Sequence, residues 1–376
     1  MNYKKINNLR IVIPIILFSV ISIITIYSSQ TMLSSSFNDL YIKQIIWYLI
    51  GFILVIFISR KKNQTNDNLI NILYIIGNIL LVLVLFFGTE ANGSRCWFTI
   101  PGIGSFQPSE FMKIFLILMI AKELEKSCKK NYQRTLRDEV KVIFKCFILT
   151  LIPTILTFLE PDTGIVFIYF IILLIMLFIF GIRYRWFFIG IIFMAIVLFA
   201  FFYLFFKQQN TFISIFGTDF FYRMDRLLDW SNGAGMQLTN ALASSGSAGL
   251  FGYGLNNNPI YFPEPQTDFI FSVFTTNFGF IGASILLLLI IYFDYQLIKV
   301  GIKSSGKDKY IISGILSMII FQQIQNIGMN IGLLPITGIT LPFISYGGSS
   351  LISYMIIIGI VININNKNKY ENEYGK

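Results

Sequence analysis

No charged side chain occurs in the stretch Gly164-Ile-Val-Phe-Ile-Tyr-Phe-Ile-Ile-Leu-Leu-Ile-Met-Leu-Phe-Ile-Phe-Gly181. A helix needs roughly 20 mostly apolar residues to cross the hydrocarbon core of a bilayer. Similar apolar runs recur along the chain and are separated by polar segments. We predict about ten membrane-spanning helices, at residues 11–28, 43–59, 69–87, 108–122, 142–159, 164–181, 187–206, 269–293, 310–331 and 348–364.

The overall composition agrees with a membrane protein. Of the 376 residues, 55% are apolar and only 13% are charged, whereas soluble domains carry about 25% charged residues. The composition therefore argues against a water-soluble fold. We expect an all-α polytopic membrane protein that forms a single membrane domain over residues 1–376.

Basic residues are concentrated in alternate loops, which accounts for the net charge of +10 without a nucleic-acid partner. Loops rich in Lys and Arg face the cytoplasm under the positive-inside rule. Both termini are thus predicted to be cytoplasmic, and segments 29–42, 88–107, 160–163, 207–268 and 332–347 to be external. The basic clusters are Lys4, Lys5 and Arg10; Arg60, Lys61 and Lys62; Lys122, Lys126, Lys129, Lys130, Arg134, Arg137 and Lys141; Arg183 and Arg185; Lys299, Lys303, Lys307 and Lys309; and Lys367, Lys369 and Lys376.

The chain contains no histidine, and its three cysteines show no CxxC spacing. A zinc site of the usual Cys/His type and catalysis by imidazole are therefore not expected. Acid–base chemistry would fall to Asp, Glu, Lys or Tyr. The segment 301–308 nearly spells a P-loop, but it lacks the final Ser or Thr and joins two spans. We expect no nucleotide, no haem and no zinc.

The external segment 207–268, between the seventh and eighth spans, is long enough to be a functional loop. Its first part, residues 213–230, separates into an apolar and a charged helical face. Such a helix either lies in the membrane interface or caps the bundle. The glycines of segment 246–254 would allow close backbone approach to a ligand, or tight turns. The two faces consist of Phe216, Phe220, Met224 and Leu227, and of Asp219, Arg223, Arg226 and Asp229.

Acidic residues recur at the outer ends of the spans. Asp268, beside Glu264, opens an apolar span, so it is either an N-terminal helix cap or a functional acid. Glu110 and Lys113 stand one turn apart inside another span, where charges form a structural ion pair or face a polar cavity. Asp162 adds a further acid on a tight outer turn.

Three segments resemble the RodA/FtsW/SpoVE (SEDS) family of polytopic bacterial proteins that build peptidoglycan. Gly93-Ser-Arg95-Cys-Trp97 with Gln107-Pro-Ser-Glu110 is similar to that family's Gly-x-Arg-x-Trp and Gln-Pro-Ser-Glu stretch. Pro263-Glu-Pro-Gln-Thr-Asp268-Phe resembles its Pro-Glu-x-His-Thr-Asp-Phe element. The segment 326–350, rich in Gly, Pro, Ser and Thr, is similar to the family signature nearly in full and is the most specific match. The resemblance covers essentially the whole chain.

The resemblance implies an inverting hexosyltransferase that polymerises lipid II, the undecaprenyl-pyrophosphate-linked disaccharide-peptide, at the outer face of the bacterial cytoplasmic membrane. It implies a class B penicillin-binding protein as the partner that crosslinks the strands, with lipid II and membrane lipids as contacts and no nucleic acid. Asp268 matches the family's essential aspartate and is the predicted general base. The predicted substrate-binding residues are Arg95, Trp97, Glu110, Lys113, Asp162, Arg223, Glu264, Ser345 and Ser349.

Pyrophosphate is the leaving group in this reaction, and positive charge would stabilise it. Arg95, Lys113, Arg223, Arg226 or a divalent cation, Mg or Mn, would supply that charge. The resemblance alone leaves the choice among them open.

The chain departs from the family pattern in three places. Gln266 stands where the family usually has His, Thr275-Thr-Asn277 replaces a usual pair of glutamates, and segment 228–237 is shorter than in relatives. Pro335-Ile-Thr-Gly338-Ile looks closer to the RodA branch, which serves cell shape, than to the division branch. Two other functions stay open: a lipid II transporter (flippase) and a non-catalytic scaffold for a penicillin-binding protein.

Overall fold

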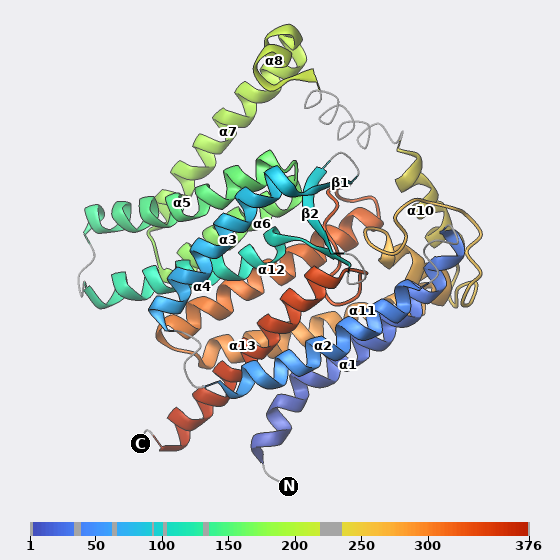
Figure 1. The fold of residues 1–376 in the computed structure, drawn as a ribbon, viewed down its shortest axis with the longest axis horizontal. Coiled ribbons are helices and arrows are strands. Elements are labelled where there is room, and N and C mark those ends of the chain that lie inside the picture. Colours follow the sequence, from blue (N-terminus) through green and yellow to red (C-terminus); the bar gives the residue numbers. More distant parts are fainter. Residues whose placement is uncertain are drawn as a thin grey trace.

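The computed structural model describes residues 3–33, 39–61, 66–91, 94–100, 104–130, 135–218 and 235–374. Long helices dominate these ranges (Figure 1). They are α1 (Tyr3–Ser29), α2 (Leu40–Arg60), α3 (Asp67–Phe87), α4 (Pro108–Lys130), α5 (Leu136–Leu159), α6 (Thr163–Phe180), α7 (Tyr184–Lys207), α11 (Ile270–Lys303), α12 (Gly306–Asn330) and α13 (Gly348–Tyr374). Shorter elements are the 3-10 helix η1 (Gln30–Met32), α8 (Gln209–Phe216) and α10 (Met236–Ser247).

Each predicted span lies on one of the long helices. In the described part of the chain, nine helices are long and apolar enough to cross a membrane. Helix α4 is not among them, because charged residues occur at both of its ends. It nevertheless packs against α3, α5, α6, α12 and α13, and its Met112, Leu116 and Ile120 are fully buried. The protein is a polytopic helical membrane protein with α4 in its interior.

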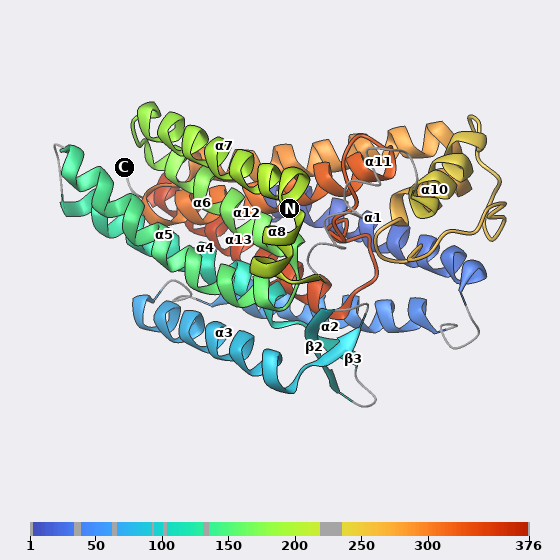
Figure 2. The same ribbon diagram turned by 90° about the horizontal axis from the view of Figure 1, so that it is seen from above.

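Helices α12 and α13 form the centre of the bundle, and 72% of the most apolar window of each is buried. Helix α12 packs on α4, α6 and α11, while α13 packs on α2 and α4. Helix α7 lies at the periphery (Figure 2), and none of its most apolar window is buried. Exposed apolar side chains such as Ile191 and Phe199 suit a surface that faces lipid instead of water.

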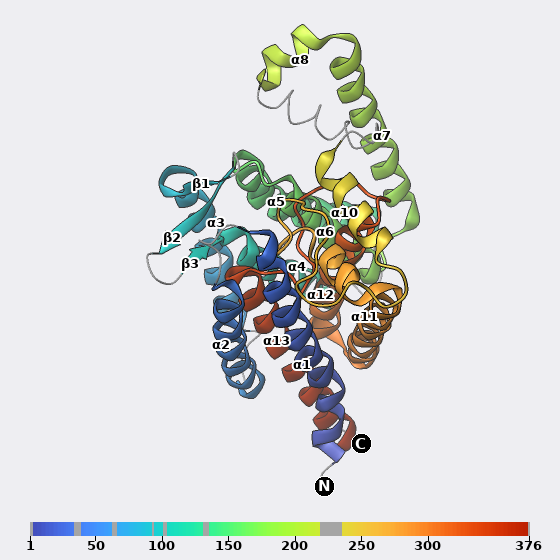
Figure 3. The same ribbon diagram turned by 90° about the vertical axis from the view of Figure 1, so that its right-hand side faces the viewer.

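Both termini lie at one end of the bundle, and α10 and the β-strands lie toward the other (Figure 3). The basic clusters near the termini therefore lie at the opposite end from the acidic residues of the outer loops. This arrangement agrees with the orientation predicted from charge.

The external segment 88–107 contains β-structure, which the prediction of an all-α protein did not include. Strands β1 (Thr89–Ala91), β2 (Ser94–Ile100) and β3 (Gly104–Phe106) form an antiparallel sheet in the order β1-β2-β3. Short strands alternating with turns give a weak periodic signal beside long apolar helices, so the sequence indicated only a loop.

The glycine-rich segment after α10 packs against a kink in α11. Gly279 has a non-helical backbone there, with φ of 65°, and Gly252 has a φ of 79°. The N–H of Phe280 donates to the Gly249 carbonyl at 3.0 Å. A Cβ on Gly252 would lie 2.3 Å from the Asn277 carbonyl oxygen, a clash that only glycine avoids. These glycines therefore permit close contact with the chain's own backbone.

The predicted amphipathic helix at 213–230 lies mostly outside the described residues. Helix α8 ends at Phe216, and residues 219–234 are not described. Arg223 and Arg226, two predicted sources of positive charge, belong to that range.

Candidate functional site

A cavity of about 400 Å³ lies at the outer end of the bundle, a volume typical of small-molecule sites. Its wall comes from the β-sheet, the start of α4, the turn before α6, the segment before α11 and the segment 337–350. No Lys or Arg is among the described residues that line it. Its acidic lining residues are Glu110, Asp162, Glu264 and Asp268.

The backbone of Asp268 is fixed by two asparagines of α12. The Nδ2 atoms of Asn326 and Asn330 donate to the Asp268 carbonyl oxygen at 3.0 and 2.9 Å. Asn330 Oδ1 in turn accepts from the backbone N and the Oγ of Ser272, at 3.0 and 2.7 Å. The two asparagines thus hold the chain at the start of α11 and set the position of Asp268.

The carboxylate of Asp268 does not cap α11. The N-cap residue is Phe269, and it makes no side-chain capping bond. Among the described residues, no hydrogen bond to the Asp268 carboxylate is formed, while a Cβ on Gly338 would lie 3.9 Å from its Oδ2. The alternative of a helix cap is therefore wrong. The carboxylate lies at the cavity wall beside a segment whose glycine leaves room for it.

Burial raises the pKa of Asp268 from 3.8 to about 7, and the negative charges of Glu264 and Asp162 contribute in the same direction. Removing an ionised carboxylate from water is costly, and nearby like charges add to that cost. A carboxylate whose pKa lies near the working pH is suited to general base catalysis.

Glu264 lies in a tight turn, with φ of 53°, and its carboxylate is held by its own segment. Gln266 Nε2 and Thr267 Oγ1 each donate to Glu264 Oε2 at 3.0 Å. Ser345 Oγ donates to the Thr267 carbonyl at 2.6 Å, and the N–H of Tyr346 donates to the Gln266 carbonyl at 2.9 Å. Ser345 does not line the cavity, so it supports this turn from behind.

Asp162 caps α6 and also lines the cavity. Its Oδ1 accepts from the Ile165 N–H at 3.2 Å, and its Oδ2 accepts from Gln107 Nε2 at 2.8 Å. Burial raises the pKa of Asp162 to about 6, although the Ile165 N–H partly offsets this. The neighbouring Glu160 is fully buried and finds no hydrogen-bond partner among the described residues. Burial raises its pKa to about 9, and the negative charge of Asp162 contributes in the same direction, which favours the protonated form at neutral pH.

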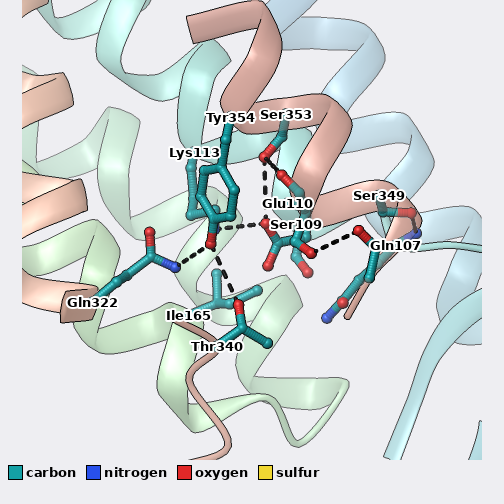
Figure 4. A network of polar contacts seen from close by, with 12 residues as sticks. Gln107, Ser109, Glu110, Lys113, Ile165, Gln322, Thr340, Ser349, Ser353 and Tyr354 are labelled. Carbon is teal, nitrogen blue, oxygen red and sulfur yellow. Dashed lines mark hydrogen bonds and ion pairs between the residues drawn. The ribbon is translucent and has the colours of Figure 1, made fainter. Parts of the chain in front are cut away.

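Glu110 and Lys113 form an ion pair inside the bundle, and Glu110 also reaches the cavity. Lys113 Nζ donates to Glu110 Oε2 at 2.7 Å and lies 5.4 Å from the Tyr354 ring centroid. Gln322 Nε2 donates to the Tyr354 hydroxyl at 2.9 Å, and Ser353 contacts Glu110. Figure 4 shows these side chains pointing toward one another. The two residues therefore form an ion pair, and Glu110 is also part of the cavity wall.

The remaining predicted binding residues are divided between the cavity and its surroundings. Trp97 and Ser349 line it, and Ser349 Oγ donates to the Ser105 carbonyl at 3.0 Å. Lys113 is fully buried behind the wall. Arg95 does not line the cavity; it is half-exposed on β2 and pairs with Glu90 at 3.7 Å. The proposed roles of all these residues stay predictions.

Several polar residues at the site were not predicted individually. Gln322, Asn326 and Asn330 stand four residues apart on α12, so they share one helical face. Buried polar side chains at that spacing inside an apolar span are costly unless they have partners, which is a usable signal in the sequence. Gln107 and Tyr354 belong to the site because Gln107 contacts Asp162 and Tyr354 contacts Lys113, and the sequence gives no signal for either contact.

The described residues contain no group of three or more His, Cys, Asp or Glu side chains arranged to hold a metal ion. A site made wholly of protein ligands therefore does not fit this part of the chain. Magnesium is commonly held by one or two carboxylates together with substrate phosphates. The acidic wall of the cavity fits that second arrangement.

Fold and site together define a polytopic membrane protein with an acidic cavity at its outer end. The family model described as cell cycle protein, which covers FtsW, RodA and SpoVE, matches residues 8–370. The chain belongs to this family.

Relatives agree over most of the chain. Stage V sporulation protein E of Bacillus subtilis is 33% identical over 388 aligned positions, covering 96% of this chain and 98% of that protein. The probable peptidoglycan glycosyltransferase FtsW of Hydrogenovibrio crunogenus is 34% identical, covering 78% of this chain and 73% of its own length.

Solved structures share the architecture as well. One, described as the structural coordination of polymerization and crosslinking by a peptidoglycan synthase complex, superposes with a TM-score of 0.76 at 25% identity, covering 95% and 97% of the two chains. RodA of Thermus thermophilus superposes with a TM-score of 0.65 at 26% identity, covering 94% and 96%.

Proposed function

We propose that the protein is a peptidoglycan glycosyltransferase that polymerises lipid II at the outer face of the membrane, with Asp268 as its general base. The observation that carries this proposal is the Asp268 carboxylate, which lies at the wall of an outer cavity without a hydrogen-bond partner in the described chain and has a pKa of about 7. The names of relatives such as the FtsW proteins support the reaction class.

The chemistry requires one proton transfer and one displacement. A hydroxyl oxygen of the acceptor sugar forms a bond to the anomeric carbon of the donor while the bond from that carbon to the pyrophosphate oxygen breaks. Asp268 takes the hydroxyl proton as the bond forms. A single displacement inverts the anomeric centre and needs no second carboxylate as nucleophile.

The leaving pyrophosphate needs positive charge that the described cavity wall does not supply. Lys113 is engaged with Glu110 behind the wall, and Arg95 lies outside it. A magnesium or manganese ion held by Glu264 or Asp162 and by the substrate phosphates would neutralise charge on the leaving group. The acidic lining, which would otherwise repel pyrophosphate, supports this part of the proposal.

The proposed partner is a class B penicillin-binding protein that crosslinks the new strands. The likeness to a chain of a peptidoglycan synthase complex supports such an assembly. The relatives include a stage V sporulation protein and FtsW proteins, so the affinity to the RodA branch stays a prediction.

The test is polymerisation of lipid II by the purified full-length protein, with Asp268→Asn compared with Asp39→Asn. Asp39 is an exposed acid of the outer segment 29–42 that does not line the cavity and makes no side-chain capping bond to α2, so it is a matched control. We expect Asp268→Asn to lower polymer formation by about 10²- to 10⁴-fold and Asp39→Asn to leave it unchanged. Equal product from the two variants would contradict the assignment of Asp268.

Two further assays on the same purified protein distinguish the alternative functions. Movement of labelled lipid II across vesicles that survives Asp268→Asn, with no polymer from the unmodified protein, would favour a transporter. Co-purification with a penicillin-binding protein but no polymer at any magnesium or manganese concentration would favour a scaffold.

A further inference from the structure

A second, smaller cavity lies at the cytoplasmic end of the bundle, between α1, α11 and α13. Its volume is about 50 Å³, against roughly 30 Å³ for one water molecule in the liquid. It therefore admits a group of a few heavy atoms. Its lining residues are Arg10, Ile11, Gln296, Lys299, Val300, Lys303 and Asn365.

Three of these residues are cations from two different helices. Arg10 lies on α1, whereas Lys299 and Lys303 stand one turn apart on α11. In the described part of the chain, no acidic side chain lies within ion-pair distance of any of them. Other cytoplasmic lysines do pair: Lys145 with Glu123, Lys307 with Asp67 and Lys367 with Asp308. The cavity therefore concentrates positive charge that the described protein does not neutralise.

A buried amide in the same cavity also lacks a partner. Gln296 is only 7% exposed, and it makes no hydrogen bond with any described residue. Gln296 lines the cavity, and neither of its polar side-chain atoms is among the fully buried unpaired atoms of the described chain, so its Nε2 is available to donate to an oxygen of a bound group. Asn365 also lines the cavity, and its Nδ2 donates to Asn8 Oδ1 at 2.8 Å.

The orientation inferred from the basic loops places the cavity near the inner-leaflet headgroups. Lys303 is the last residue of α11, where the helix leaves the membrane on the cytoplasmic side. The lower part of α11 also carries the lipid-facing side chains Ile298 and Ile302, which are 39% and 79% exposed. A molecule with its head in the cavity would have apolar surface available for its chains.

We propose that this cavity binds the phosphate group of an anionic phospholipid of the inner leaflet. Arg10, Lys299 and Lys303 neutralise the charge, and Gln296 donates to a phosphate oxygen. Basic cavities between transmembrane helices on the cytoplasmic side are suited to such headgroups. The cavity has room for the phosphate group only, so the rest of the lipid lies in the bilayer along α11.

The first test compares two variants that lose the same charge at the same face. One is Arg10→Gln/Lys299→Gln/Lys303→Gln, and the matched control is Arg60→Gln/Lys141→Gln/Lys309→Gln. The three control residues are exposed and do not line the cavity. Retention of phosphatidylglycerol and of phosphatidylcholine by the full-length protein is measured by native mass spectrometry.

We expect the cavity variant to bind phosphatidylglycerol less tightly by about fivefold for each cation removed. The control should change by less than about twofold, because its cations act only through the general surface charge. Phosphatidylcholine retention should be weak in all proteins. An equal loss in both variants, or equal retention of both lipids by the unmodified protein, would overturn the proposal.

Two further measurements separate a lipid from free phosphate and from a folding defect. Millimolar inorganic phosphate should not displace phosphatidylglycerol. If it does displace the lipid, the cavity is a site for the free ion instead. Gln296→Leu keeps all three cations and should weaken phosphatidylglycerol binding roughly tenfold. If the triple variant does not fold, unchanged binding by Gln296→Leu would refute the proposed contact.

Discussion

Asp268 and Glu110 line the same cavity, yet their carboxylates have opposite surroundings. Glu110 accepts from the fully buried Lys113 at 2.7 Å, while the charges that shift the pKa of the Asp268 carboxylate, among the described residues, are the like charges of Glu264 and Asp162. The Glu110 carboxylate is engaged by a cation, whereas the Asp268 carboxylate has no hydrogen-bond partner in the described chain and is available to accept a proton from a substrate. Both carboxylates line one cavity, so their ability to accept a proton differs because Glu110 has a cationic partner and Asp268 has none among the described residues.

The largest expected effect is on the rate when the unpaired acid is neutralised. Asp268→Asn should lower polymerisation by about 10²- to 10⁴-fold, the usual contribution of a positioned general base. Because the folded protein raises the pKa of Asp268 to about 7, ionisation costs more in the folded than in the unfolded state. The melting temperature of the variant above neutral pH should therefore be unchanged or higher. A lower melting temperature together with the lost activity would indicate a structural role instead.

The next effect is on stability when the ion pair is broken. Lys113→Met leaves Glu110 buried and uncompensated, so we expect a loss of about 3–5 kcal/mol of folding free energy. The double variant Glu110→Gln/Lys113→Met should recover most of it. Thermal unfolding in detergent measures both, and a double variant no more stable than the single one would refute the pairing argument.

The pH dependence of the rate tests the unpaired acid directly. The base must be ionised, so the rate should rise with pH up to about 7, falling roughly tenfold for each unit below it, because the pKa of Asp268 is raised to about 7. Glu264→Gln removes a like charge and should move the midpoint to lower pH. A midpoint near 4 in the unmodified protein, or one unmoved in the variant, would contradict the assignment.

The smallest effect concerns the residues that position the base. Asn330→Ala removes a bond to the Asp268 carbonyl and two bonds from Ser272, and should slow polymerisation about tenfold. Asn363→Ala is the control, since Asn363 donates to the backbone carbonyls of Ser59 and Lys61 at the cytoplasmic end. The polymerisation rate at saturating substrate is measured for both variants. Equal slowing in both would show that the loss comes from a less rigid helix bundle and not from the position of Asp268.

The spans could be predicted because apolar runs of sufficient length have few alternatives to crossing a bilayer. Helix α4 was predicted correctly although its ends are charged, because Gln107-Pro-Ser-Glu110 marks its start. The strands at 89–106 were not predicted, since their short pattern is weaker than that of the neighbouring helices.

Part of the cavity lining could be predicted from the sequence, but its geometry could not. Asp268, Glu110, Asp162 and Glu264 all reach one cavity, which followed from their common position at the outer ends of spans. The clamp on Asp268 depends on Asn326 and Asn330, 58 and 62 residues away in sequence, and such pairings require knowledge of which helices are neighbours. The place of Arg95 depends likewise on the register of β2, which the local sequence does not specify.

The non-helical backbone of Gly279 divides α11 into two helical segments. Backbone bonds from Tyr253 to Thr276 and from Gly254 to Asn277 tie the loop after α10 to the turn before the kink, and the bond from Phe280 to Gly249 ties it to the residue after the kink. Because the loop is bonded on both sides of Gly279, it bridges the gap that the non-helical residue leaves in the hydrogen-bond ladder of α11.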